Sequence, residues 1–394
     1  MKAPVTAASL LENVQEIAPI IQEHAVRGEQ ERRLAPSVVE AMVEAGLFRM
    51  WTPQVFGGLE VDPVTAMRVF EEVARLDSAA GWNLQLSSAV TPFFAWFPDA
   101  GAEEIFRGNP DVVFSGTLFP PGHAVPVEGG YRLTGRWPFV SGCQNSAWYF
   151  GPAFIMDGGA PRVGELGEPI QIVVAYPAKE AEILDTWHTV GMRGTGSHDV
   201  VAKDVFIPER RTALLAPLTC PGTAFQGPLY RLTIWPPTAA LAPPALGIAR
   251  AAIDALLDLG KKKTPNYTRT PLRERPTVQA GVARAEALLG AARAYLHESL
   301  REGWETAVQG QMLSLEQKMK IQLATTYAIR AAADAVDLVH EAAGTTAIRN
   351  EHRFQQHWRD VHVITQHAFV STSRYESVGK LLFGLETDWT FFPL

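Results

Sequence analysis

The sequence predicts an α+β protein in which a β-rich region lies between two helical regions. Apolar residues recur at helical spacing up to about residue 110, and helical spacing returns from about residue 226 onward. Between these regions, short runs rich in β-branched and aromatic residues are separated by glycine and proline. Because 394 residues exceed an ordinary domain of roughly 100–200 residues, we expect three regions: 1–110, 111–225 and 226–394.

The N-terminal region carries several helix signals. The segment "PSVVEAMVEAGLF" has Pro36 at a helix start and Gly46 at its end, which is the usual asymmetry. "DPVTAMRVFEEVARLD" places the apolar residues of 64–76 along one helical face. At the N-terminus, Glu12 and Glu16 interrupt the apolar residues, so this stretch predicts an amphipathic helix and not a signal peptide.

The middle region is predicted to consist of short strands. The runs "DVVFSGTL", "AWYFGPAFIM", "PIQIVVAYP" and "VVAKDVFIP" are strand-like, and glycine and proline punctuate them. In "VEGGYRLTG", Gly129 and Gly130 stand between two strand-like runs, which is a hairpin signal. We therefore expect a β-domain inserted between helical ones.

The C-terminal region contains two long predicted helices. "VQAGVARAEALLGAARAYL" places an apolar stripe from Val278 to Leu296. The next helix opens with Ser314 and Gln317 in capping-box spacing and closes at Gly344. Because its middle holds few bulky polar residues, we expect it to be buried on several sides, as at a subunit interface.

Composition argues against several classes of partner. The formal net charge is −7, and the isolated "KKK" at 261–263 fits a helix end or a solvated loop better than a nucleic-acid site. Cys143 and Cys220 define neither a disulfide framework nor a CxxC motif, which indicates a reducing cytoplasm. No window approaches the roughly 18 apolar residues that a membrane span needs. We expect a cytoplasmic protein without nucleic-acid or membrane partners.

Five of the ten histidines lie between His340 and His367. His352, His357, His362 and His367 recur every five residues, so on one helix each would be rotated by about 140° from the last. Side chains spread in this way cannot converge on one ion, and "HEAAG" lacks the second histidine of a HExxH zinc helix. We therefore expect no metal site, surface or core roles for most histidines, and an acid–base role for one of them.

Common glycine and serine motifs are absent or incomplete. "GMRGTGSHD" at 191–199 is not GxGxxG and opens no obvious helix, which argues against a dinucleotide-binding Rossmann turn. Neither GxSxG nor "HGGG" occurs, so a Ser-His-Asp hydrolase has no motif support.

The order of helices, β-domain and helices resembles the acyl-CoA dehydrogenase fold, whose middle domain is β-barrel-like and whose C-terminal domain is a four-helix bundle. Four segments carry this resemblance in the expected order and over nearly the whole chain. They are "EAGLFRMWTPQVFGG" (44–58), "GRWPFVSGCQNSAW" (135–148), "TVGMRGTGSHDVVAKDVFIPE" (189–209) and "WRDVH" (358–362).

The resemblance also points to one branch of that superfamily. A typical acyl-CoA dehydrogenase carries a glutamate base in an "EGT" segment shortly after the "RD". Here the segment reads "TQHAFV", and His367 stands about where the base would be. Together with "W-x-F-x-S-G" at 137–142, this pattern resembles the two-component flavin monooxygenases. That group includes hydroxyphenylacetate hydroxylase oxygenase components, dibenzothiophene monooxygenase and amino-sugar N-oxygenases.

The resemblance implies a function and a set of partners. A separate reductase would supply reduced FMN (or FAD), which reacts with O₂ to give a C4a-hydroperoxyflavin that oxidises an aromatic or other electron-rich small molecule. The Ser141 hydroxyl would lie beside the flavin N5, and His367 would deprotonate or orient the substrate's OH or NH. Relatives in this group are homotetramers, so we expect the same assembly here.

Further site residues follow from the same resemblance. Arg269 matches an arginine that reaches a neighbouring subunit's flavin phosphate, to which a guanidinium binds well, although Arg273 and Arg275 lie nearby. The "RGTGS" turn would contact the flavin's ribityl or phosphate tail. The expected cofactor-binding residues are Ser115, Trp137, Ser141 and Arg269, and the expected substrate-binding residues are His123, Trp82 and Trp96.

Several alternatives remain open at this point. Ser141 fits an ordinary turn serine, Trp137 a buried strand tryptophan, and Arg269 a solvated loop arginine. The chain also fits an acyl-CoA dehydrogenase with FAD and a displaced base, for which the candidates are Glu341, Glu351 and Glu376. A third interpretation is a flavin-binding protein without turnover. The substrate is not readable, although the aromatic-rich first region suits a flat apolar compound such as a phenol, an indole or a polyketide.

Overall fold

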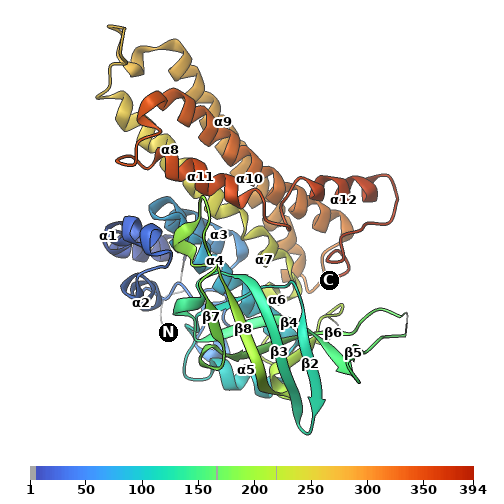
Figure 1. Cartoon of the computed structure of the whole chain (residues 1–394). Helices are drawn as coiled ribbons and strands as arrows, with labels where there is room; N and C mark the ends of the chain where they lie inside the picture. The colour runs from blue at the N-terminus through green and yellow to red at the C-terminus, as the bar shows by residue number, and fades with distance from the viewer. Residues whose placement is uncertain (1–5, 166, 219) are drawn as a thin grey trace.

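The computed structural model describes residues 6–165, 167–218 and 220–394 (Figure 1). The N-terminal helices are α1 (Ala7–Glu31), α2 (Pro36–Glu44), α3 (Pro63–Leu76), α4 (Ser78–Val90) and α5 (Asp99–Phe106). The strands are β1 (Phe114–Gly116), β2 (Gly122–Val127), β3 (Gly130–Val140), β4 (Trp148–Asp157), β5 (Ala160–Pro161), β6 (Gln171–Pro177), β7 (Glu182–Leu184), β8 (His198–Pro208) and β9 (Thr212–Leu214). The C-terminal helices are α6 (Pro228–Arg231), α7 (Trp235–Ala239), α8 (Ala242–Gly260), α9 (Pro276–Val308), α10 (Leu315–Ala343), α11 (Phe354–Ile364) and α12 (Ser373–Leu382).

The strands form one mixed sheet in the order β7-β8-β3-β2-β4-β6-β9, with β1 and β5 also paired to β4. The β2–β3 hairpin confirms the turn predicted from two glycines. Val127 pairs with Gly130 across the turn, and Gly129 has a φ of 75°, a left-handed conformation that glycine adopts without strain. The sheet has an apolar core of its own, which includes Leu133 and Trp137, while strand residues such as Phe150 and Val173 belong to a second core shared with the helices.

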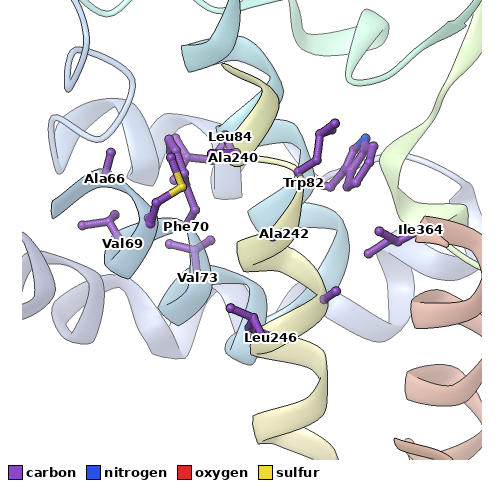
Figure 2. Close-up of a cluster of buried hydrophobic side chains, with 14 of the residues drawn as sticks. Ala66, Val69, Phe70, Val73, Trp82, Leu84, Ala240, Ala242, Leu246 and Ile364 are labelled. Atoms are coloured by element: carbon purple, nitrogen blue, oxygen red, sulfur yellow. The ribbon is translucent and has the colours of Figure 1, made fainter. Parts of the chain in front are cut away.

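The two helical regions share one apolar core. Figure 2 shows side chains of α3, α4, α8 and α11 within it, with Phe70, Leu246 and Ile364 among them. Burying an apolar side chain of this size stabilises the fold by about 1.5–3 kcal/mol. The predicted class, with helices, then a β-domain, then a helical bundle, is confirmed. The exact domain boundaries at 110 and 225 stay a prediction, because one core joins the first and third regions.

Two predictions about long helices had different outcomes. The Ser314 hydroxyl accepts from the Gln317 amide at 3.2 Å, the Gln317 side chain accepts from the Ser314 amide at 3.0 Å, and α10 ends at Gly344 as predicted. The expectation that no segment would be apolar enough to cross a membrane was wrong. Residues 235–260 meet the length and composition that a span requires, but 72% of the most apolar window is buried within the protein. This segment therefore belongs to the core.

Arg359 and Asp360, the "RD" pair of α11, connect the β-domain to the helices. The buried Asp360 carboxylate accepts hydrogen bonds from the Ser78 hydroxyl and the Met192 amide, both at 2.6 Å. Ser78 opens α4, and Met192 lies in the loop that leads into β8. Burial raises the pKa of Asp360 to about 6, because the surrounding protein disfavours the charged form. One carboxyl group thus joins three segments that are far apart in the sequence.

Arg359 holds the same loop from the neighbouring position. Its guanidinium donates to Glu29 of α1 at 2.5 Å and to the carbonyl of Val190. A Cβ at Gly191 would lie 2.5 Å from the Arg359 carbonyl oxygen, so only glycine allows the loop to approach α11 this closely. The loop is therefore fixed to α11 by side-chain and backbone contacts together.

We predict that Asp360→Ala lowers the free energy of unfolding by about 2–4 kcal/mol, because a buried amide and a buried hydroxyl lose their acceptor. Denaturant titration measures the change. Asp337→Ala is the matched control: Asp337 binds His362 on the surface, its side chain is 48% exposed, and its removal should cost under about 1 kcal/mol. Equal losses in the two variants would contradict the role given to Asp360.

Candidate active site

Trp82 of α4 joins the two residues that the sequence singled out as catalytic. Its indole Nε1 donates to the Ser141 Oγ at 3.1 Å. Its ring packs edge-on against the His367 imidazole, with ring centres 5.8 Å apart and an interplanar angle of 64°. The structure therefore brings together a hydroxyl from the β-domain, an indole from the first helical region and an imidazole from the last.

A break in strand pairing positions Ser141. The register between β3 and β8 shifts between Trp137 and Val140, and Phe139 within this break has a φ of 60°, which is unusual for a bulky residue. The chain then turns at Gly142, whose φ is 75°. The irregular end of β3 thus places Ser141 next to α4 instead of continuing the ladder.

Ser115 contacts the backbone of this turn. Its side chain is fully buried, and its hydroxyl donates to the Ser141 carbonyl oxygen at 2.5 Å and contacts the Ser146 hydroxyl. A Cβ at Gly142 would lie 3.3 Å from both the Ser115 Oγ and the Asn83 side chain, so the turn is closely surrounded. Ser115 therefore supports the Ser141 backbone within this chain.

A chain of hydroxyl groups extends from Ser141 into the β-domain. The Ser141 Oγ lies 2.7 Å from the Ser197 Oγ, and the Ser197 Oγ lies 2.6 Å from the Thr195 Oγ1. Thr195 in turn donates to the Met192 carbonyl oxygen at 2.7 Å. Sequence reasoning noted the "RGTGS" turn but assigned it to the flavin tail, and it missed this link to Ser141.

His367 lies in the turn that follows α11. Its Nδ1 accepts a hydrogen bond from the Phe369 amide at 3.3 Å. The ring keeps some exposed surface, yet protein surrounds it on most sides, and this burial lowers the pKa of His367 to about 4. The imidazole is therefore neutral at pH 7. Because Nδ1 accepts, the remaining proton lies on Nε2, which is then a donor.

Three aromatic rings continue from His367 toward the C-terminus. Phe369 packs on His367 with ring centres 5.9 Å apart, and Trp389 and Phe391 pack on Phe369 at 4.8 and 4.7 Å. The Arg374 guanidinium lies 3.8 Å from the centre of the Trp389 ring. These residues were not predicted, because only an isolated arginine and scattered aromatics mark them in the sequence.

Arg374 carries buried polar atoms. Within the described part of the chain, its Nε and Nη1 have no hydrogen-bond partner, while Nη2 donates to Ser373 at 3.1 Å. Burial lowers the pKa of Arg374. The neighbouring carboxylate of Asp388 is engaged by Lys380 and Ser377, each at 3.1 Å. A buried guanidinium in this state favours an added anionic partner.

The two other predicted tryptophans are engaged elsewhere. Trp137 lies inside the β-domain core, where its Nε1 donates to the Pro152 carbonyl at 3.0 Å and its ring packs 5.9 Å from Tyr176. This position favours the buried strand tryptophan that the sequence left open. Trp96 donates to the Ala216 carbonyl at 2.7 Å and packs on Phe93, so it belongs to the aromatic core of the N-terminal region.

His123 and Arg269 are both exposed in this chain. His123 lies on β2, opposite Thr134 of β3. Arg269 lies in the connection between α8 and α9, which Figure 1 places at the end of the helical bundle far from the β-domain. Neither side chain joins the group around Trp82, and an Arg269 contact with a flavin would require a neighbouring subunit.

The remaining C-terminal histidines point to different surroundings. His357 is buried, which lowers the pKa of its ring to about 3, whereas His362 binds Asp337 at 2.9 Å near the surface.

The three glutamates considered as displaced bases, Glu341, Glu351 and Glu376, are all exposed. Over residues 6–165, 167–218 and 220–394, no group of three or more His, Cys, Asp or Glu side chains could hold a metal ion.

Comparison with known proteins places the chain in a family. Residues 10–100 match the model "Acyl-CoA dehydrogenase, N-terminal domain", and residues 239–372 match "Acyl-CoA dehydrogenase, C-terminal domain". An indole-3-acetate monooxygenase of Pseudomonas putida is 33% identical over 92% of this chain and 91% of its own length. The flavin-dependent monooxygenase oxygenase subunit HsaA of Rhodococcus jostii is 28% identical over 95% of this chain and 98% of its own.

Solved structures agree with these relatives. The structure of XiaF from Streptomyces, in complex with FADH2 and glycerol, superposes with a TM-score of 0.88 and 26% identity, covering 97% of each chain. The predictions of an acyl-CoA dehydrogenase-like fold, a reduced flavin and a monooxygenase reaction are thereby confirmed. The chain belongs to the family of flavin-dependent monooxygenase oxygenase components that share the acyl-CoA dehydrogenase fold.

Proposed function

We propose that this protein oxidises an aromatic small molecule with O₂ in the space bounded by Ser141, Trp82 and His367. The observation that carries the proposal is the position of Trp82, which contacts both Ser141 and His367. A separate reductase supplies the flavin, as the designation of relatives as oxygenase subunits implies. Bound reduced flavin would supply the electrons and the activation of O₂.

The residues around Ser141 fit the polar edge of a flavin ring. Ser141 is buried, and its Oγ bonds to Trp82 and Ser197, which leaves one further hydrogen-bond position on the oxygen. The buried Asn83 donates through Nδ2 to the Thr195 carbonyl at 3.3 Å, while its Oδ1 has no partner in the described part of the chain. The Ser141 Oγ and the Asn83 Oδ1 are thus two acceptors next to the turn at Gly142. They would accept hydrogen bonds from N–H groups of a reduced flavin.

His367 would hold the substrate's oxygen or nitrogen. Its neutral ring donates through Nε2, because Phe369 occupies Nδ1. We propose that this donor orients the substrate for attack, and that proton removal by His367 would first require the other tautomer. In that second tautomer His367 would act as a general base, and such assistance is worth roughly 10²–10⁴ in rate.

The substrate class that fits best is an aromatic carboxylic acid. The rings of Phe369 and Trp389 offer an apolar wall beside His367, and Arg374 at the end of that wall has buried N–H groups to pair with a carboxylate. The relative named indole-3-acetate monooxygenase acts, by its name, on such a compound. The proposal would therefore place the ring near His367 and the carboxylate at Arg374.

Assembly and compartment follow the sequence expectations. We propose a homotetramer, in which Arg269 of one subunit reaches the flavin phosphate of another and the apolar α10 lies close to a neighbouring subunit. The two free cysteines, Cys143 and Cys220, agree with a reducing cytoplasm.

The central test is a coupled assay in air with a flavin reductase, NADH, FAD or FMN, and indole-3-acetate as the first probe. We expect an oxygenated product by mass spectrometry. His367→Ala should lower product formation by about 10²–10⁴-fold and raise hydrogen peroxide release, while reduced flavin binds nearly as tightly. His362→Ala is the matched control and should retain activity. Wild-type turnover in the His367 variant would refute its role.

The pH dependence of stability provides a second test. His367 has a folded pKa of about 4 against an ordinary value of 6.5, so the unfolded chain binds more protons between these pH values. The contribution of His367 to the free energy of unfolding is therefore fully present above about pH 6.5 and is lost as the pH falls toward 4. We predict that wild type loses more stability than His367→Asn between pH 7 and 5, by up to about 1.4 kcal/mol per pH unit. Parallel curves would show that the ring titrates normally.

A third test addresses the carboxylate. We predict that wild-type protein binds indole-3-acetate about 10- to 100-fold more tightly than indole-3-acetamide, as expected for charge-assisted hydrogen bonds. Arg374→Met should remove this difference, whereas Arg301→Met, at an exposed arginine bound to Glu298, should keep it. Calorimetry measures both ligands. Equal affinity of the acid and the amide for wild type would contradict the proposed substrate class and leave the oxygenase function standing.

A further inference from the structure

We propose that Ser197 and Thr195 are positioning residues that hold the Ser141 hydroxyl as a hydrogen-bond acceptor toward the flavin. This arrangement gives the protein a preference for reduced over oxidised flavin. The inference rests on the proposed function, which places Ser141 at the polar edge of the flavin ring, and on the family resemblance, which implies that Ser141 lies beside the flavin N5.

The direction of the hydroxyl chain is fixed at its inner end. The Thr195 Oγ1 lies 2.7 Å from the Met192 carbonyl oxygen. A carbonyl oxygen only accepts, so the single hydroxyl hydrogen of Thr195 lies between these two atoms. The 2.6 Å contact between Thr195 and Ser197 must then be filled by the Ser197 hydrogen. By the same argument, the Ser141 hydrogen fills the 2.7 Å contact between Ser141 and Ser197.

The outer end of the chain agrees with this direction. The indole Nε1 of Trp82 can only donate, and it lies 3.1 Å from the Ser141 Oγ. Ser141 therefore accepts from Trp82, and by the order fixed at the Met192 carbonyl it donates to Ser197. Its oxygen retains one lone pair and has no hydrogen to offer to a ligand. Trp82, Ser141, Ser197 and Thr195 are all buried, so water does not readily compete for these bonds.

This polarity distinguishes the two redox states of a flavin. The N5 of a reduced flavin carries a hydrogen and donates, whereas the N5 of an oxidised flavin presents a lone pair. A Ser141 oxygen that can only accept bonds to the first and repels the second. An oxygenase component takes up reduced flavin and must release oxidised flavin after turnover, and this polarity favours both events.

The chain can be interrupted without changing Ser141. In Thr195→Val, Ser197 loses its acceptor and can turn its hydrogen to Ser141, which frees the Ser141 hydrogen for the ligand. In Ser197→Ala, Ser141 loses its own acceptor with the same result. Both variants should therefore bind oxidised flavin better than wild type does.

The test is the ratio of dissociation constants for oxidised and reduced flavin. Oxidised flavin is titrated by fluorescence quenching and reduced flavin by anaerobic equilibrium binding. We expect a wild-type ratio of about ten or more, and a three- to tenfold lower ratio in each variant, as one hydrogen bond would give. The midpoint potential of the bound flavin is a second readout, and it should fall by about 30 mV for each tenfold loss in the ratio.

Thr238→Val is the matched control. Its buried hydroxyl donates to the Ile234 carbonyl at 2.9 Å in a helix outside the hydroxyl chain, so the ratio should stay at the wild-type value. Thermal melting monitored by circular dichroism verifies that each variant is folded. If only one of Thr195→Val and Ser197→Ala folds, that variant alone is enough for the test. An unchanged ratio in a folded Thr195→Val or Ser197→Ala, or a lowered ratio in Thr238→Val, overturns the inference. Wild-type protein that binds neither flavin would overturn the proposed function as well.

Discussion

The position of one buried carboxylate, that of Asp360, constrains the whole site. It accepts from Ser78 at the start of α4 and from the Met192 amide in the loop before β8. Trp82 lies one helical turn beyond Ser78, and His367 follows the helix that carries Asp360. The hydroxyl chain ends on the carbonyl of Met192. Together with the Arg359 contacts to Glu29 and Val190, this acceptor therefore holds the indole, the imidazole and the hydroxyls in their relative positions.

The contacts of the buried Asp360 carboxylate with Ser78 and Met192 have an energetic cost. The sheet has a second apolar core of its own, but strand residues such as Phe150 and Val173 belong to the core that the helices share. Apolar burial therefore packs the β-domain against the helices, and Asp360 adds directional hydrogen bonds to that packing. A buried, doubly bonded carboxylate is directional, but desolvation raises the pKa of Asp360 to about 6. The protein therefore keeps a desolvated carboxylate at Asp360, where three segments meet. Buried charged groups with shifted pKa values are common at functional sites.

Much of the fold could be predicted from local patterns, because those patterns act over short distances. The capping box at Ser314 and the glycine turn at Gly129 depend on residues within a few positions of each other. The positions of Ser141 and His367 in the fold came from family-like segments, and the structure brings both to Trp82. Their chemical roles are proposals, because a contact alone does not establish a reaction.

The rest depends on contacts that no local pattern encodes. Ser78 and Asp360 are separated by 282 positions, and the Ser141–Ser197 contact depends on the register of β3 against β8. The sequence left open whether Trp137 would contact the flavin or lie buried in a strand, and it could not indicate which of two cores a buried ring would join. Among the described residues, the buried Nε and Nη1 of Arg374 have no hydrogen-bond acceptor, and no sequence pattern indicates this.

The most direct measurement is a crystal structure of the protein with reduced flavin, grown and frozen without oxygen. The account predicts the flavin N5 within hydrogen-bond distance of the Ser141 Oγ and an open space between the ring and His367 that an aromatic substrate can fill. A flavin ring bound elsewhere, or a Ser141 side chain turned away from it, would contradict the account.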